Sequence, residues 1–355
     1  MELLDFDRYP LWLNLVLTAT AAAAVWVAGT RLAREADAIS KRTGAGEAFV
    51  GLILLGAIVS LPELSTSITA SWMGNPSFAV STLVGGISAV MVSLAVVDAI
   101  TRDQPVSSDV RHPVVLFQGV LTVLFLVIAA AGMVVGDVAV VFGVGAWSTA
   151  LFVLYLLFVL LVQRYQRREP WVVGEEMRAS IRHPPEGDGE EERDDEDRRP
   201  LSRIVLATGV SAVVTLAAGI VLAGAGNAIA DQTGLGAGFV GMLIGGIATS
   251  LPEATTFYGA VRIRQYELAF GDAFGTNLFS TMAIFAADVA YRGGPVLAEV
   301  GKFGLLATLL GIAVNATYLA GCIERPNRRV LGMGVDSLVV LGMYVGGMFL
   351  LYRMR

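Results

Sequence analysis

Long apolar runs separated by short polar segments recur along the whole chain. A helix that crosses a bilayer needs about 20 predominantly apolar residues, and ten runs reach that length. They cover residues 11–33, 46–71, 76–100, 111–134, 137–163, 203–226, 236–262, 266–291, 296–320 and 330–352. The pattern therefore predicts an all-α membrane protein with ten transmembrane helices.

A long polar segment divides the ten spans into two groups of five. It covers residues 164–203 and contains nine acidic residues between Glu186 and Asp197. Such a charged segment cannot bury enough apolar surface to order itself. We expect a first half over residues 1–163, a solvated acidic linker over 164–203 and a second half over 204–355.

Basic residues gather in alternate loops and predict the orientation of the spans. The loops after the first, third, seventh and ninth spans and the start of the linker are basic, whereas the alternate loops carry only Arg292 and Lys302. By the positive-inside rule, the N-terminus lies outside and the linker is cytoplasmic. Five spans per half then place the second half upside down relative to the first, which is typical of secondary transporters.

The composition agrees with a membrane protein and argues against several other classes. Hydrophobic residues make up 55% of the chain and charged residues 16%. The sequence contains no phosphate-cradling glycine loop, nucleotide motif or Cys/His metal spacing. With a net charge of −6 as well, we expect neither an enzyme nor a nucleic-acid partner, and the sequence indicates no cofactor.

One apolar segment occurs twice, 190 positions apart. Residues 49–67 read FVGLILLGAIVSLPELSTS, and residues 239–257 read FVGMLIGGIATSLPEATTF. The register extends outward, so the first repeat covers about 37–100 and the second about 227–290. Each repeat carries one glutamate directly after a proline, Glu63 in the first and Glu253 in the second. We therefore expect ten helices arranged as two inverted five-helix repeats.

The repeated motif contains the chemistry of a cation site. A carboxylate at bilayer depth is costly unless it faces a cavity, a partner or an ion. The proline breaks the helix beside it and can free backbone carbonyls, and the serine or threonine before it adds hydroxyl oxygens. Hard cations such as Ca²⁺ and Na⁺ prefer ligands of this kind. The alternative is a proline kink whose glutamate bonds a neighbouring helix.

Two further acidic residues recur in register near the ends of spans. Asp98 and Asp288 occupy equivalent positions of the two repeats. We expect their side chains to reach back to the membrane interface, as long or charged side chains near span ends often do.

The SLPE motif, followed by a span with the run Gly275-Thr276-Asn277-Leu278-Phe279-Ser280, resembles the repeats of the sodium/calcium exchanger family. The resemblance covers all ten spans. It implies that motif glutamates and neighbouring hydroxyls bind Ca²⁺ and Na⁺ alternately in one central site. It places the following residues at ligand positions: Glu63, Glu253, Ser60, Thr249, Ser250, Thr276, Asn277 and Ser280.

The first repeat departs from the family pattern more than the second. Val59 stands where the family has a threonine, and the run Gly85-Gly86-Ile87-Ser88-Ala89-Val90 lacks its serine and both asparagines. Asp272 and Ser88 are candidates to replace lost oxygens, and a helix cap is the alternative role for Asp272. The resemblance thus predicts the family more firmly than the transported ion.

The sequence favours Na⁺/Ca²⁺ antiport by alternating access at a midplane site, in a plasma or inner membrane. Exchange coupled to H⁺ is the alternative, because paired buried carboxylates can hold protons in place of a cation. A channel or a cation-binding protein without transport is a third hypothesis, and the sequence does not indicate an oligomeric state.

Overall fold

The computed structural model describes most of the chain and leaves gaps at the first SLPE repeat and the linker. The described residues are 5–43, 58–101, 104–136, 140–141, 143–165, 200–325 and 328–354. The start of the expected second span, residues 46–57, and the acidic run at Glu186–Asp197 lie outside them.

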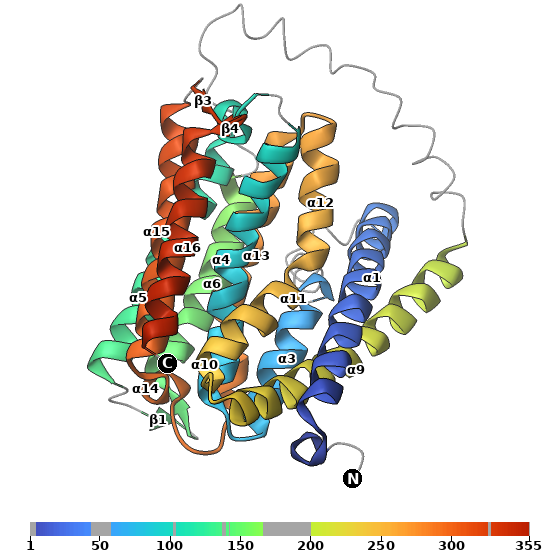
Figure 1. The fold of residues 1–355 in the computed structure, drawn as a ribbon. Helices are drawn as coiled ribbons and strands as arrows, with labels where there is room; N and C mark the ends of the chain where they lie inside the picture. Colours follow the sequence, from blue (N-terminus) through green and yellow to red (C-terminus); the bar gives the residue numbers. More distant parts are fainter. Residues whose placement is uncertain are drawn as a thin grey trace, which may run out of the picture.

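Helices dominate the described part of the chain (Figure 1). In the first half they are α1 (Leu11–Thr43), α3 (Leu61–Trp72), α4 (Pro76–Thr101), α5 (Pro113–Val135) and α6 (Ala146–Tyr165), with short 3₁₀ turns η2 (Phe6–Arg8) and η4 (Val106–Asp109). In the second half they are α9 (Leu201–Thr233), α10 (Ala237–Val240), the π-helical turn η5 (Gly241–Gly246), α11 (Ile247–Thr249), α12 (Leu251–Arg262), α13 (Tyr266–Ala290), α14 (Val296–Glu299), α15 (Gly301–Glu324) and α16 (Val335–Arg353).

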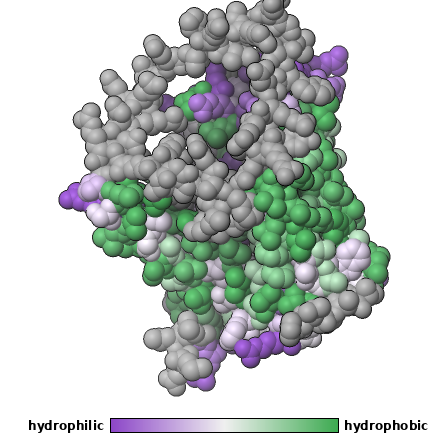
Figure 2. All heavy atoms as spheres, turned by 180° about the vertical axis from the view of Figure 1, so that it is seen from behind, coloured by the Kyte–Doolittle hydropathy of each residue, from purple (hydrophilic) through white to green (hydrophobic). Residues whose placement is uncertain are grey.

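The helices confirm an all-helical membrane protein. Among the described residues, seven helices are long and apolar enough to cross a bilayer, and α10–α11 with α12 form one further span bent by 45°. Apolar side chains cover the flank of the molecule, and polar side chains gather toward its ends (Figure 2). The predicted ten-helix count includes α3, whose preceding residues are not described, and α6, whose apolar stretch Ala146–Leu161 is shorter than those of the other spans.

Two predicted spans begin later than expected, because each is preceded by a small β-hairpin. Strands β1 (Val140–Val141) and β2 (Val144–Gly145) precede α6, and β3 (Arg329–Val330) and β4 (Met333–Gly334) precede α16. The turns need a backbone with positive φ, which Gly143 and Gly332 supply at 86° and 87°. Continuous helices from 137 and 330 were therefore the wrong prediction. The two hairpins lie at opposite ends of the bundle (Figure 1).

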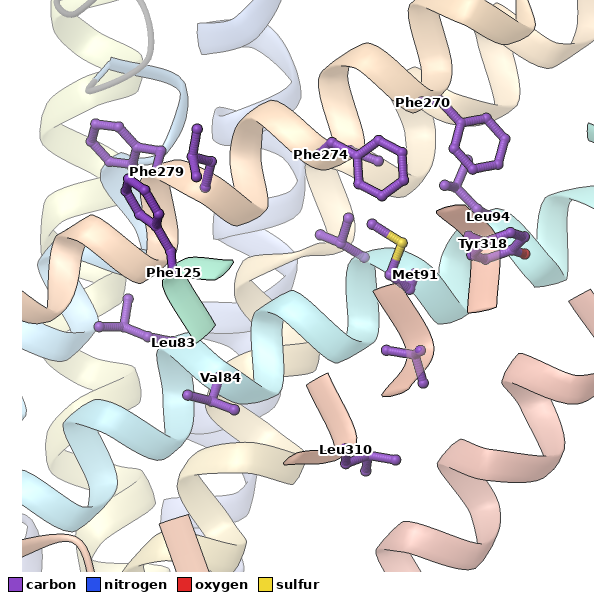
Figure 3. Packing of buried hydrophobic residues seen from close by; sticks show 14 of the residues in the cluster. Leu83, Val84, Met91, Leu94, Phe125, Phe270, Phe274, Phe279, Leu310 and Tyr318 are labelled. Atoms are coloured by element: carbon purple, nitrogen blue, oxygen red, sulfur yellow. The ribbon is translucent and has the colours of Figure 1, made fainter. Parts of the chain in front are cut away.

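Helices α4 and α13, which are equivalent in the two repeats, form the centre of the bundle. Both are far more buried than the surrounding spans. Met91 and Leu94 of α4 lie beside Phe270 of α13 and Tyr318 of α15 (Figure 3). In a bilayer, helices are held together by side-chain packing and not by the removal of apolar surface from water. The packed centre therefore fixes the positions of the polar groups within it.

Small residues allow α4 to cross the bent span at close range. A Cβ built at Gly85 would come to 2.7 Å from the backbone of Met242, and one built at Gly246 would come to 2.6 Å from the backbone of Gly85 and Gly86. Side chains at these positions would push the two elements apart. The crossing therefore brings Gly86 beside Thr249 and Ser250.

Helices α1 and α9 pack against each other and each reaches a motif of the opposite half. Gly29 of α1 lets the helix approach Pro252 so closely that a Cβ there would come to 2.6 Å from Cγ. Gly219 of α9, its equivalent, lies against Ser65 of α3. The hydroxyl of Ser65 donates to the carbonyl of Leu216 at 2.8 Å. The pair α1–α9 thus contacts the start of both motif helices.

Asp98 and Asp288 do not reach the interface, so that prediction was wrong. Their side chains are 0% and 1% exposed. Asp288 accepts from the backbone N–H of Gly145 at 2.8 Å, and Asp98 accepts from the N–H of Gly334 at 2.7 Å. Each carboxylate therefore binds the hairpin of the opposite half. The backbone N–H groups that donate to it offset the cost of burying its charge.

Candidate cation site

The two motif glutamates occupy the same local position in their helices. Glu63 and Glu253 lie in the first turn of α3 and α12, each directly after a proline that is tolerated there because its missing N–H has no partner in a first turn. Helix N-termini carry partial positive charge, which stabilises a carboxylate. The sequence SLPE thus starts a helix and places its glutamate at the positive end.

The second motif breaks its span as predicted. The chain bends by 45° between Thr249 and Leu251, after a glycine-rich π-helical turn. At this break the carbonyl of Gly246 accepts from the hydroxyl of Ser250 at 2.9 Å and from that of Thr249 at 3.3 Å. A hydroxyl that donates its proton to a carbonyl keeps its lone pairs free for a cation.

The structure brings the glutamates into one buried region. Glu63 is 1% exposed and Glu253 is 2% exposed, and their charges interact directly. Oε2 of Glu63 and both carboxylate oxygens of Glu253 make no regular hydrogen bond to any described residue. Buried carboxylate oxygens without a partner are costly, so the pair is suited to a positively charged ligand.

Ser60 and Ser250 both stand at the residue before their helix and are buried. Ser250 contacts the opposite repeat, since its hydroxyl also lies 3.3 Å from the carbonyl of Gly86. A Cβ at Gly86 would come to 3.4 Å from Oγ of Ser250 and 3.9 Å from Oγ1 of Thr249. The position where the first repeat lacks a serine therefore faces the hydroxyls of the second repeat.

The predicted residues of α13 lie along the helix next to α3 and α12. Thr276, Asn277 and Ser280 are buried. Asp272 is partly exposed, and its charge interacts with that of Glu253. The contacts of the described residues do not connect Thr276 or Ser280 to either glutamate. Ser88, in contrast, faces Gly311 of α15 and makes no regular hydrogen bond within the described part.

One polar residue of this region was missed in the sequence. Asn315 of α15 is fully buried, donates to the carbonyl of Gly311 at 2.8 Å and accepts from the amide of Asn277 at 3.0 Å. Because the Asn277 amide nitrogen is engaged, its Oδ1, which has no regular partner among described residues, is turned away from Asn315. An asparagine inside the apolar run 296–320 was the available signal.

The donor set consists of oxygens. No three His, Cys, Asp or Glu side chains come together as a metal cluster in the described part of the chain. A cation between the glutamates would therefore take its remaining ligands from hydroxyl, amide and carbonyl groups, which suits a hard cation. An all-helical membrane protein with such groups at a broken helix has the architecture of a cation transporter.

Comparison with known proteins agrees with this class. The family model described as sodium/calcium exchanger protein matches residues 13–162 and 202–353, and the chain belongs to that family. The putative antiporter CaxA of Alkalimonas amylolytica is 23% identical over 336 residues, covering 92% of this chain and 95% of the relative.

Solved structures share the fold. The H⁺/Ca²⁺ exchanger CAX superposes with a TM-score of 0.65 at 12% identity, covering 98% of this chain and 86% of its own. The sodium-calcium exchanger NCX_Mj superposes with a TM-score of 0.55 at 11% identity, covering 96% of this chain and 99% of its own. These structures share the fold of the chain, and the family match identifies the chain as a cation antiporter, in agreement with the resemblance of its repeats.

Proposed function

We propose that this protein exchanges Ca²⁺ against a monovalent cation, with Glu63 and Glu253 as the charged ligands of the transported ion. The observation that carries this proposal is the buried glutamate pair, whose charges interact and whose oxygens have no regular partner among described residues. One divalent ion neutralises both carboxylates and removes their repulsion.

The remaining ligands come mainly from the second repeat. Thr249, Ser250, Thr276 and Asn277 supply oxygens there, with Asp272 before them and Ser280 after them on α13. The first repeat supplies Ser60 beside Glu63, while Gly86 and Val90 stand at the other ligand positions of the family. The ion therefore lies away from the axis between the repeats, toward α12 and α13.

Alternating access between two inverted halves gives such a site its coupling, because two ions that compete for one site bind the two access states differently. The exchange of hairpin contacts between the halves and their placement at opposite ends of the bundle support an inverted five-helix repeat. The basic loops support an outside N-terminus, a cytoplasmic 164–203 linker and insertion in a plasma or inner membrane.

Na⁺ is the first candidate for the counter-ion. The hydroxyl and amide oxygens of Thr249, Thr276 and Asn277 are ligands that Na⁺ uses and that a proton does not need. H⁺ is the second candidate, because the first repeat lacks oxygens that the family uses to bind Na⁺ and a proton does not need them. Two protons on Glu63 and Glu253 balance the charge of one Ca²⁺ without any further ligand.

Flux in proteoliposomes tests the proposal. Uptake of ⁴⁵Ca²⁺ is measured first under an outward Na⁺ gradient at equal pH, and then under an outward H⁺ gradient without Na⁺. Uptake driven by Na⁺ alone establishes Na⁺ exchange, and uptake driven by the pH gradient alone establishes H⁺ exchange. Ca²⁺ flux that needs neither counter-ion would indicate a channel and contradict antiport.

A further inference from the structure

A second region of buried acidic side chains lies at the β3–β4 hairpin. The two hairpins are held in equivalent ways, since the last glycine of each donates its N–H to an aspartate of the opposite half, Gly145 to Asp288 and Gly334 to Asp98. The first hairpin therefore shows what this arrangement needs when it serves structure alone.

At the first hairpin the aspartate is fully provided with donors. Asp288 accepts from the N–H of Gly145, from the N–H of Val296 at 2.9 Å and from the hydroxyl of Ser148. Both of its carboxylate oxygens are engaged. Its burial is thus explained without a ligand.

The second hairpin keeps the glycine contact and differs at the other two. Val106 is the equivalent of Val296, but its N–H does not donate to the aspartate. Oδ1 of Asp98 therefore makes no regular hydrogen bond in the described part. The serine equivalent to Ser148 is Ser337, which bonds the hydroxyl of Tyr318 at 3.1 Å. A second carboxylate, Asp336, stands where the first hairpin has Trp147. Two acidic side chains therefore replace one.

These two carboxylates lie against the same glycine of the hairpin, Gly334. The charge of Asp98 acts on Asp336. A Cβ built at Gly334 would overlap Oδ1 of Asp336 and come to 3.3 Å from Oδ2 of Asp98, so both groups flank the same backbone atom. Asp98 is 0% exposed and Asp336 is 7% exposed. Like charges brought together in a low-dielectric region repel each other.

A third oxygen points into the same region. Ser107 of η4 is fully buried, and its hydroxyl faces the Asp336 carboxylate outside the geometry of a regular hydrogen bond. Oδ2 of Asp336 likewise makes no regular bond to a described residue. Two carboxylates and a hydroxyl with free lone pairs form an oxygen set that attracts a hard cation.

We propose that Asp98, Asp336 and Ser107 bind a divalent cation of the Ca²⁺ class at a second site, separate from the glutamate pair. The three residues come from α4, α16 and η4. A bound ion would therefore fasten the end of α4 to the start of α16 and to the turn before α5. The site belongs to the loops that the basic residues assign to the cytoplasm, so it would respond to Ca²⁺ on that side.

Equilibrium binding of ⁴⁵Ca²⁺ to four purified proteins tests the second site. Wild type should fill both sites, Glu253→Gln only the new site, Asp336→Asn only the central site, and the double variant neither. Loss of a charged ligand should weaken binding at its own site more than about thirtyfold. If Glu253→Gln has no effect while Asp336→Asn does, the central site is wrong and the second site stands.

Two controls keep the result interpretable. Asp109→Asn changes an exposed carboxylate of the same turn, which pairs with Arg111 at 2.6 Å, and should leave binding unchanged. Ser107→Ala removes one neutral oxygen and should weaken the second site about threefold, which tests the site even if Asp336→Asn fails to fold. Equal Ca²⁺ binding by Glu253→Gln and the double variant, or no binding by Glu253→Gln, would overturn the proposal.

Discussion

At the scale of single residues, the glutamate pair carries the proposed transport. Glu253→Gln keeps the shape of the side chain and removes its charge. Both Glu253 oxygens are buried without a regular partner in the described part, so loss of the charge should weaken Ca²⁺ binding at the central site more than about thirtyfold and abolish exchange. Binding and flux of ⁴⁵Ca²⁺ measure this. Glu299→Gln, at an exposed position, is the matched control, and normal flux in Glu253→Gln would contradict the proposed site.

The hydroxyl ligands should contribute unequally between the repeats. Thr249→Ala and Thr276→Ala each remove one oxygen, so Ca²⁺ affinity should fall about three- to tenfold. Val59→Ala, at the position equivalent to Thr249, removes no oxygen and should change affinity little. Calcium titration of the purified variants decides this. Equal losses at Val59 and Thr249 would mean that the first repeat contributes in a way its side chains do not explain.

The sequence could single out the residues of the candidate site, but not the partners that the fold gives to buried polar groups. Glu63 and Glu253 stand out because a charge inside an apolar run, repeated in register, has few structural explanations. Asn315 was missed because it lies outside the repeated motif, and only the fold brings α15 against α13. Asp98 and Asp288 were misinterpreted for the same reason, since their partners are backbone N–H groups of distant hairpins.

At the scale of elements, hydropathy predicted which segments are helical but not where helices end. Helices α1 and α9 extend beyond their apolar runs to Thr43 and Thr233. The backbone hydrogen bonds of a helix do not depend on hydropathy, so a helix can continue into polar residues until a residue such as glycine ends it. Gly234, with φ of 66°, ends α9. The hairpin before α6 is as apolar as the span it precedes, and the hairpin before α16 adds Arg329, so the turn glycines are the signal that both hairpins share.

The crossing of α4 with the bent span depends on one glycine more than on its neighbour. Gly85→Ala places a methyl group 2.7 Å from the backbone of Met242, so the helices must move apart, and stability should fall by roughly 1–3 kcal/mol. Gly86→Ala makes ordinary contacts of 3.4 Å or more and should be tolerated by the fold. Thermal unfolding of the two variants in detergent measures the difference. Equal stability of both would show that the crossing is looser than the structure indicates.

At the scale of the whole molecule, two halves of common origin have diverged in what they supply. Each half holds a hairpin of the other through a buried aspartate, and each starts a motif helix at a glutamate. The neutral oxygens, in contrast, lie mainly in the second half. In the proposed site, the halves therefore share the framework equally and the ligands unequally.

The linker provides the last prediction, because it joins the halves without supplying a residue to the proposed site. Deleting residues 186–197 removes nine carboxylates. Salt screens the electric field of these carboxylates within about 8 Å at physiological ionic strength. The glutamates of the proposed site belong to α3 and α12 and not to the linker. Exchange by the deletion variant should therefore stay within about twofold of wild type. Flux of ⁴⁵Ca²⁺ at matched amounts of inserted protein measures this. Replacing the same residues with a neutral Gly/Ser segment of equal length separates charge from length. Loss of exchange in both variants, with insertion intact, would assign the acidic run a direct part in transport.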